Sequence, residues 1–178
     1  MPLTLLIGAA RSGKSEIAVR MGEASSRAVV VIATAEARDE EMAERVRLHR
    51  RRRPSSWTTI EEPVDLEGAV RSAPEDAFVI VDCLTLWVAN LLEAGTAPEE
   101  IEDRALAAAG LAEKRPAETL AVTNEVGAGI VPGNALARTF RDVHGRVNTI
   151  WGAAAERALL VVAGRVLDLR RPEDLPDV

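Results

Sequence analysis

The stretch Gly8–Ser15, with the sequence GAARSGKS, decides the fold of this 178-residue chain. It matches the whole pattern G-x-x-x-x-G-K-[ST], in which two glycines, a lysine and a hydroxyl residue have fixed spacing. The apolar run Leu3–Ile7 precedes it, and a helical pattern over Lys14–Glu23 follows it. The sequence therefore predicts a phosphate-binding loop between a buried strand and a helix, and this context disfavours a chance match on a glycine-containing turn.

Each part of the loop has a physical role. The two glycines allow backbone angles and close approaches that a side chain would block. The backbone N–H groups then form a nest for anions at the positive end of the helix. Lys14 supplies a mobile charge to the terminal phosphates, and the Ser15 hydroxyl can bind Mg²⁺. We therefore predict nucleotide contacts at Gly8, Ala9, Ala10, Arg11, Ser12, Gly13, Lys14 and Ser15.

Apolar runs rich in Val, Ile and Leu predict parallel strands that are covered on both faces. They lie at Leu3–Ile7, Ala28–Ala33, Phe78–Val81, Leu120–Thr123 and Leu159–Ala163. Helical patterns occupy Lys14–Glu23, Asp39–Arg52, Val64–Ser72, Leu84–Glu93, Glu99–Glu113 and Asn134–Arg157, the last with a break expected near Gly145. A final strand, Val166–Leu169, is predicted to be antiparallel because Gly164-Arg165 gives hairpin spacing.

This alternation predicts an α/β fold: a P-loop NTPase-type three-layer domain with a mostly parallel sheet and a C-terminal antiparallel edge hairpin. The chain is long enough for one domain with a full core, which we place at residues 1–169. Residues 170–178 include Pro172 and Pro176, and we predict that they form a loosely ordered tail.

The composition is that of an ordinary globular protein, with 47% hydrophobic and 28% charged residues. The formal net charge of −6 disfavours nucleic acid as a partner, because general affinity for nucleic acid needs a basic surface. Cys83 is the only cysteine, which excludes an intrachain disulfide and favours a cytoplasmic location. The longest apolar runs are too short to span a bilayer, and we expect no membrane span.

Two carboxylates follow predicted strands, at the sheet edge where such folds bind ligands. Asp82 ends the run FVIVD, where the second Mg²⁺ contact beside a phosphate loop is expected. The alternative role for Asp82 is an N-cap for the helix that starts at Leu84. Glu125 could orient water, bind the metal, hold the acceptor or act as a turn residue. We predict a metal site at Ser15 and Asp82 and leave Glu125 open.

His49 is a candidate nucleophile. It shares a predicted helix face with Met42 and Val46, and the run Arg50–Arg53 follows it directly. Histidine can form covalent intermediates, and arginines gather the phosphates that such a nucleophile attacks. On these residues alone, a solvated helix end with basic side chains against the helix dipole is the better-supported interpretation.

Taken together, the motifs resemble the bifunctional adenosylcobinamide kinase / adenosylcobinamide-phosphate guanylyltransferase family of cobalamin biosynthesis. The segments that carry the resemblance are GAARSGKS at 8–15, IAT at 32–34, the pattern D-x-E-M-x-x-R-x-x-x-H ending at His49, Trp57 with Glu61, VDCLTLWVANLL at 81–92, TNEVGAGIVP at 123–132 and FRDVHGRVN at 140–148. They cover nearly the whole chain in order. The last two segments are much more specific than the phosphate loop alone.

The resemblance implies two reactions on one scaffold. ATP or GTP phosphorylates adenosylcobinamide on its aminopropanol hydroxyl, and GMP from GTP then passes through a guanylyl-histidine to adenosylcobinamide phosphate, giving adenosylcobinamide-GDP. The match makes His49 the guanylylated residue and Lys14 a second catalytic residue. It also implies a homotrimer with active sites between subunits. Beyond the phosphate loop, it places nucleotide contacts at Ala33, Thr34, Ala35, Arg50, Arg51, Arg52, Arg53, Glu61 and Asp82.

The chain departs from the family pattern at a few positions. Leu48 stands where some relatives have a second histidine, and Thr149 stands where glutamine is expected. His144 lies where no histidine is required, and we predict a local packing or capping role for it. Two rival functions stay open: an enzyme that keeps one of the two activities, and a regulatory ATPase that forms no covalent nucleotide.

Overall fold

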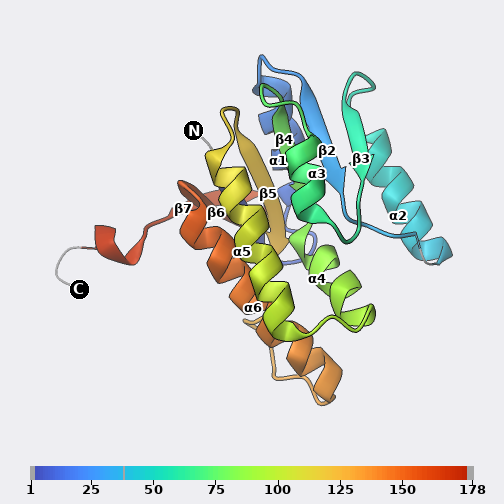
Figure 1. Cartoon of the computed structure of the whole chain (residues 1–178), viewed down its shortest axis with the longest axis vertical. Coiled ribbons are helices and arrows are strands. Elements are labelled where there is room, and N and C mark those ends of the chain that lie inside the picture. Colours follow the sequence, from blue (N-terminus) through green and yellow to red (C-terminus); the bar gives the residue numbers. More distant parts are fainter. Residues whose placement is uncertain (1–2, 38, 176–178) are drawn as a thin grey trace.

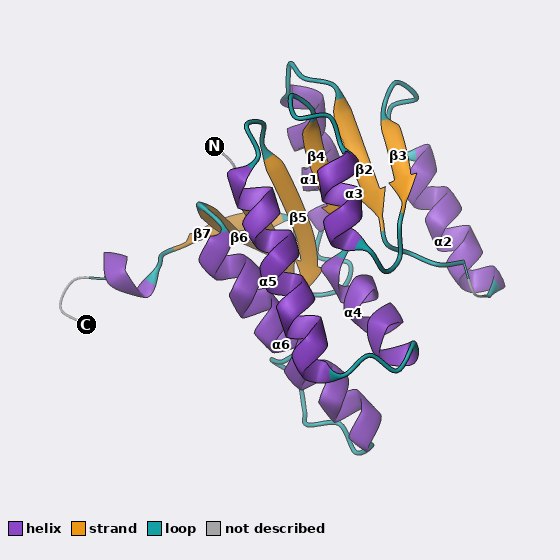
Figure 2. Ribbon diagram, viewed as in Figure 1, coloured by secondary structure: helices purple, strands orange, loops and turns teal. Residues whose placement is uncertain are grey.

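The computed structural model describes residues 3–37 and 39–175. One seven-stranded sheet has the order β3-β2-β4-β5-β1-β6-β7, and helices cover both of its faces (Figures 1 and 2). Strands β1 to β6 are parallel, and β7 pairs antiparallel with β6. The predicted three-layer α/β fold with a C-terminal antiparallel hairpin is therefore confirmed.

The elements follow one another in the alternating order typical of such folds. The strands are β1 (Leu3–Gly8), β2 (Val29–Ala33), β3 (Thr58–Glu61), β4 (Phe78–Asp82), β5 (Thr119–Asn124), β6 (Arg157–Val162) and β7 (Arg165–Leu169). The helices are α1 (Lys14–Ala24), α2 (Glu40–Arg51), α3 (Leu66–Ser72), α4 (Leu84–Glu93), α5 (Pro98–Lys114) and α6 (Ala135–Ala154). None of the helices in the described part of the chain is long and apolar enough to cross a bilayer.

The sequence-based prediction missed one strand. β3 lies at the edge of the sheet and pairs only with β2. Its end residues Thr58 and Glu61 are exposed, and the two residues between them are half-buried. A short edge strand with polar ends lacks the continuous apolar run that marked the central strands.

The predicted break near Gly145 is wrong, because α6 runs without interruption through that residue. Val143, Val147 and Trp151 are buried on one face of α6 on either side of the glycine. Packing of this apolar face offsets the modest helix penalty of one glycine, which is about 1 kcal/mol relative to alanine. The helix ends at Ala154, earlier than expected, and the next residues enter β6.

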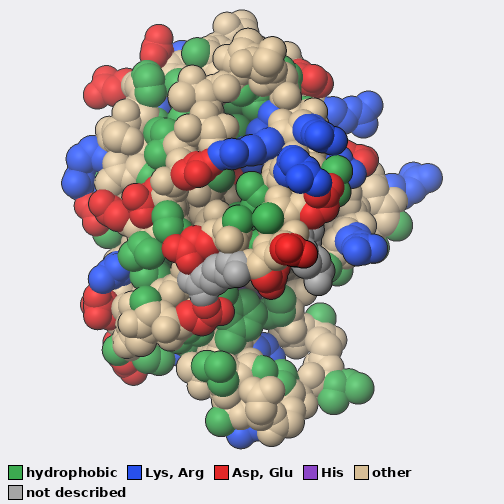
Figure 3. All heavy atoms as spheres, turned by 90° about the vertical axis from the view of Figure 1, so that its right-hand side faces the viewer, with side chains coloured by type: hydrophobic (Ala, Val, Ile, Leu, Met, Phe, Trp, Pro, Cys, Tyr) green, Lys and Arg blue, Asp and Glu red, His purple; other side chains and the backbone are tan. Residues whose placement is uncertain are grey.

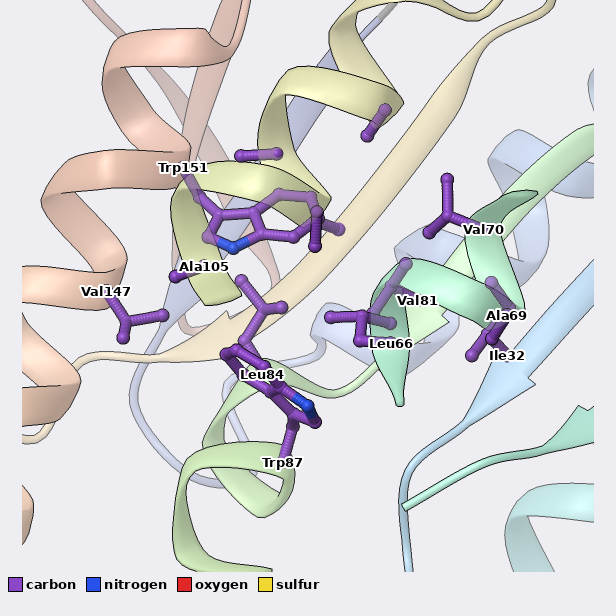
Figure 4. Close-up of a cluster of buried hydrophobic side chains, with 14 of the residues drawn as sticks. Ile32, Leu66, Ala69, Val70, Val81, Leu84, Trp87, Ala105, Val147 and Trp151 are labelled. Atoms are coloured by element: carbon purple, nitrogen blue, oxygen red, sulfur yellow. The ribbon is translucent and has the colours of Figure 1, made fainter. Parts of the chain in front are cut away.

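The core fills both faces of the sheet with mainly aliphatic side chains. On the face covered by α3 to α6, Trp87 and Trp151 lie among Leu66, Leu84 and the strand residue Val81 (Figure 4). A smaller cluster lies on the α1 face and contains Ala18 from that helix. The sheet is thus held from both sides, and its carboxyl edge is a firm base for the loops that follow β1, β2, β4 and β5.

The β6–β7 turn touches the phosphate loop. Ala163 and Gly164 have φ angles of 51° and 74°, the left-handed pair that a two-residue hairpin turn requires. The Gly164 N–H donates to the Ser12 carbonyl at 2.8 Å. After β7 the chain forms a short 3-10 turn at Pro172–Asp174. Residues 176–178 lie outside the described residues, and a loosely ordered tail stays a prediction.

Replacing Ala163 with asparagine should stabilise the protein, because asparagine tolerates the left-handed region better than alanine. We expect Ala163→Asn to raise the free energy of unfolding by about 1 kcal/mol. As a matched control, Ala107→Asn in the exposed middle of α5 should lower it by about 0.6 kcal/mol. Urea unfolding of the three proteins measures both changes, and equal effects at the two positions would contradict the strained turn.

Candidate active site

The phosphate loop joins the end of β1 to the start of α1, as the motif predicts. A Cβ on Gly8 would lie 2.3 Å from the Val161 carbonyl oxygen, so only glycine fits there. Gly13 has a φ of 105°, and Arg11 has a φ of 58°. These angles turn the backbone sharply before the helix. The loop therefore has the tight geometry that a phosphate nest requires.

Lys14 lies inside this loop. Its ammonium group donates hydrogen bonds to the carbonyls of Gly8, at 2.8 Å, and Ala9, at 2.7 Å. The side chain is only 7% exposed. Burial lowers the pKa of Lys14, and the nearby acidic groups Cys83 and Asp82 partly offset that effect. The charge that the motif assigns to the phosphates is therefore buried and hydrogen-bonded to the loop in this structure.

A cavity of about 430 Å³ opens beside the phosphate loop, between α1, the sheet and the end of α2. Ser15 lines it from the loop, Asp82 from the end of β4, and His49 from α2. Arg52, Arg53 and Trp57 lie on its wall too, with Glu16, Val19 and Arg20 from α1. One cavity thus brings together the predicted metal ligands, the predicted nucleophile and two of the predicted arginines.

Asp82 lies near both His49 and Arg53 in this cavity. Its Oδ2 accepts a hydrogen bond from Arg53 Nη2 at 2.7 Å and lies 3.9 Å from His49 Nδ1. His49 is 39% exposed at its side chain. The alternative role of Asp82 as a helix cap is wrong, because Cys83 occupies the N-cap of α4. The carboxylate instead faces the histidine and the arginine.

The other arginines of the run differ in their surroundings. Arg50 forms an ion pair with Glu61 at the end of β3, on the exposed surface. Arg51 is exposed, and Arg52 is exposed at the cavity wall. Lys and Arg side chains gather with acidic neighbours on the side of the molecule that carries α2 (Figure 3). Glu61 therefore contacts the residue that follows His49 in the sequence, but it does not line the cavity.

The segment Ala33–Ala35 joins β2 to α2 at the same sheet edge. Ala33 lies in register with Asp82 on one side and with Glu61 on the other. The Thr34 side chain is fully buried, where its hydroxyl donates to the Cys83 carbonyl at 2.7 Å and accepts from the Cys83 N–H at 2.9 Å. The structure therefore gives Thr34 a role in joining the ends of β2 and β4, and keeps its side chain out of the cavity.

Glu125 bends back on its own loop. Its Oε1 accepts a hydrogen bond from the Gly127 N–H at 2.5 Å, and its backbone N–H donates to the Gly8 carbonyl at 3.1 Å. Among the roles left open from the sequence, these contacts favour a turn residue. The same contacts connect the loop after β5 to the start of the phosphate loop.

A buried polar network behind the site escaped the sequence analysis. His144 is fully buried, and its Nε2 lies 3.1 Å from the hydroxyls of both Thr85 and Thr123. Asn148 accepts from the Thr123 hydroxyl at 2.7 Å and donates to the Asn124 carbonyl at 2.9 Å. Its members come from β5, α4 and α6, so no local spacing could reveal it. The network fits the packing role predicted for His144 and fixes the end of β5.

The cavity also fits a magnesium ion. Ser15 and Asp82 offer hard oxygen donors in its lining. No cluster of three or more His, Cys, Asp or Glu side chains able to hold a metal occurs among the described residues. Mg²⁺ suits such a sparse site, because it usually takes one or two protein oxygens and completes its shell with water and substrate phosphates.

The fold and the phosphate loop define a P-loop protein of the α/β class that uses nucleotides. Two solved structures share this fold: a protein from Pyrococcus horikoshii OT3 (TM-score 0.60, 8% identity, 97% of this chain and 88% of that one) and RadB recombinase (TM-score 0.51, 15% identity, 89% and 73%). At such low identity the likeness concerns the fold alone.

Sequence comparison is more specific. Residues 4–169 match the family described as cobinamide kinase / cobinamide phosphate guanyltransferase. The bifunctional adenosylcobalamin biosynthesis protein CobP of Pseudomonas aeruginosa is 40% identical, over 93% of this chain and 96% of its own length. The protein CobU of Salmonella typhimurium, which has the same description, is 41% identical over 91% and 96%. The chain belongs to this family, as the motifs suggested.

Removing the Lys14 charge should weaken nucleotide binding without unfolding the protein. Lys14→Met keeps the apolar stem and loses the ammonium group, so we expect the affinity for ATP to fall at least about tenfold. Because a buried charge is also removed, the unfolding temperature should stay close to that of the wild type. Calorimetric ATP titration and thermal unfolding test this; unchanged ATP affinity would contradict the assigned role of the loop.

The burial of His144 predicts that the stability of the protein depends on pH. Burial lowers the pKa of His144 from its ordinary 6.5 to about 4, with Glu125 opposing the shift. Between these values the unfolded chain binds the extra proton more readily, so stability falls as the pH falls. The wild type should lose about 3 kcal/mol more than His144→Gln between pH 6.5 and 4. Urea unfolding at several pH values measures the loss. Parallel curves in this window would contradict the prediction, whereas above pH 7 the curves should be parallel.

Proposed function

We propose that this protein phosphorylates adenosylcobinamide with ATP or GTP, and then transfers GMP from GTP, through guanylyl-His49, to adenosylcobinamide phosphate. The product of the second reaction is adenosylcobinamide-GDP. The observation that carries the proposal is the shared cavity, in which His49 lies with Ser15 of the phosphate loop and with Asp82. Family membership supports both reactions.

In the kinase step the terminal phosphoryl group passes directly to the hydroxyl of the acceptor. The phosphate loop holds the nucleotide, and Lys14 leaves the Gly8 and Ala9 carbonyls to reach the phosphates. Ser15 and Asp82 would hold Mg²⁺, which neutralises charge on the transferred group. No protein nucleophile is required, so this step needs positioning and electrostatic stabilisation only.

In the guanylyl step a ring nitrogen of His49 attacks the α-phosphorus of GTP. A phosphorus–nitrogen bond forms, the bond to the bridging oxygen breaks, and pyrophosphate leaves with the bonding electrons. A phosphate oxygen of adenosylcobinamide phosphate then attacks the same phosphorus and releases the ring. Asp82 lies on the Nδ1 side at 3.9 Å, so we assign the attack to Nε2. The carboxylate stabilises the positive charge that the ring gains.

The nucleotide contacts of this proposal are the phosphate loop with Ala33–Ala35, Arg50–Arg53, Glu61 and Asp82. We further propose a homotrimer without nucleic acid as a partner. The loop after β5 supports an assembly, because Ile130 and Val131 are exposed apolar side chains that a neighbouring subunit could cover. The free thiol of Cys83, the only cysteine, supports a reducing cytoplasm as its location.

The two activities should separate at His49. His49→Ala should abolish covalent labelling by GTP and the guanylyl transfer, yet keep the kinase rate within about threefold of the wild type. His49→Asn should behave likewise, since an amide cannot form the phosphoramidate. Intact mass after incubation with GTP detects the added GMP, and product analysis follows each reaction.

The bond itself provides the control. A phosphorus–nitrogen linkage should be labile in acid and stable in alkali. Wild-type production of adenosylcobinamide-GDP by His49→Ala would overturn the covalent mechanism, whereas loss of both reactions with an intact fold would show that His49 also serves the kinase step.

A further inference from the structure

Arg53 stands apart from the three arginines before it. Its side chain is only 10% exposed, whereas that of Arg50 is 53% exposed in its pair with Glu61. Arg53 donates through Nη2 to Asp82 at 2.7 Å, in the wall of the cavity. This is a part-buried, charge-assisted contact, of the kind that holds a side chain in one place.

The second guanidinium nitrogen of Arg53 has unused hydrogen-bonding capacity. Nη1 is buried and makes no hydrogen bond with any part of the chain that the structure describes. Buried donors nearly always have a partner, and a guanidinium offers two parallel N–H groups that suit phosphate oxygens. Because the residue lines the cavity that contains Ser15 and His49, a nucleotide phosphate is the natural partner.

Asp82 would be shared by the two cations that the site requires. The oxygen that accepts from Arg53 belongs to the carboxylate assigned to Mg²⁺, and that metal binds oxygen at about 2.1 Å in a strict octahedron. A metal ion on this carboxylate would place a second positive charge close to the guanidinium that donates to Oδ2 at 2.7 Å. Two positive groups on one carboxylate repel each other, so each weakens the binding of the other.

We propose that Arg53 is a positioning residue which competes with the metal for Asp82, and that a metal-bound nucleotide moves its guanidinium from this carboxylate to the nucleotide phosphates. The exchange leaves every charge paired: the metal neutralises Asp82, and the phosphates neutralise Arg53. Metal alone would leave Arg53 buried without a counter-charge, which makes metal binding depend on the nucleotide. The inference rests on the proposed function for the metal at Asp82 and for the nucleotide contact at Arg53.

Mn²⁺ binding to the protein without nucleotide tests this competition. Arg53→Met removes the competing charge, so its Mn²⁺ affinity, measured by electron paramagnetic resonance, should rise at least about tenfold over the wild type. Arg52→Met removes one charge from the same cavity wall and should change it less than about twofold. Arg53→Lys, which keeps the charge, should return the affinity toward the wild-type value.

Two further measurements make the outcome decisive. Asp82→Asn added to Arg53→Met should abolish the gain, which locates the metal. If Arg53→Met is unstable alone, Mn²⁺ should raise its unfolding temperature more than that of the wild type. Equal Mn²⁺ affinity in Arg53→Met and the wild type, an equal gain in Arg52→Met, or no measurable binding by any of the proteins would overturn the proposal.

Nucleotide binding should change in the opposite direction. In the presence of Mn²⁺, Arg53→Met should bind GDP at least about tenfold more weakly, because the phosphates lose their guanidinium partner. A residue with a merely structural role would weaken both ligands together. Neither measurement involves a corrinoid or covalent labelling, so a failure of guanylyl transfer at His49 would leave this result readable on its own.

Discussion

The close packing of the phosphate loop against the end of the sheet is the constraint on which the site depends. Gly8 lies against the Val161 carbonyl so tightly that no side chain fits, and the Ser12 carbonyl accepts from Gly164 in the β6–β7 turn. The C-terminal hairpin thus holds the N-terminal loop. These two contacts involve a glycine and a carbonyl oxygen of the loop, so they do not use the N–H groups that an anion nest needs.

Hydrogen bonds also fix the carboxyl ends of the parallel strands next to this loop. Thr34 joins the ends of β2 and β4 through two hydrogen bonds to Cys83, and the network around His144 fixes the end of β5. Helix α2 is different, because none of its described side chains is buried. Its C-terminal end is tied to the sheet by the ion pairs of Arg50 with Glu61 and Arg53 with Asp82. The proposed nucleotide site therefore combines a sheet edge fixed by hydrogen bonds with one helix whose C-terminal end is tied to the sheet by ion pairs.

Local sequence patterns were sufficient to predict the phosphate loop and the central strands of the sheet. A complete phosphate-loop motif and continuous apolar runs predicted the central strands, since these are buried on both faces and need no distant partner to be identified. The edge strand β3 and the unbroken α6 could not be predicted, because half-exposed pairing and packing around Gly145 depend on tertiary neighbours. The burial of Lys14 was missed for the same reason: a motif specifies its phosphate role but not the carbonyls that hold it.

The same distinction explains why the role of His49 could not be assigned from its neighbours in the sequence. A histidine followed by arginines is most often a solvated helix end, and α2 is indeed largely exposed. What separates His49 from that interpretation is a carboxylate from a different element, at the tip of β4, that faces both the ring and a buried guanidinium. A charged strand tip can thus hold a largely exposed helix end beside a phosphate loop. Under the proposed function Asp82 binds metal and Arg53 binds phosphate, so ligand binding at this edge would alter the contacts that position the helix.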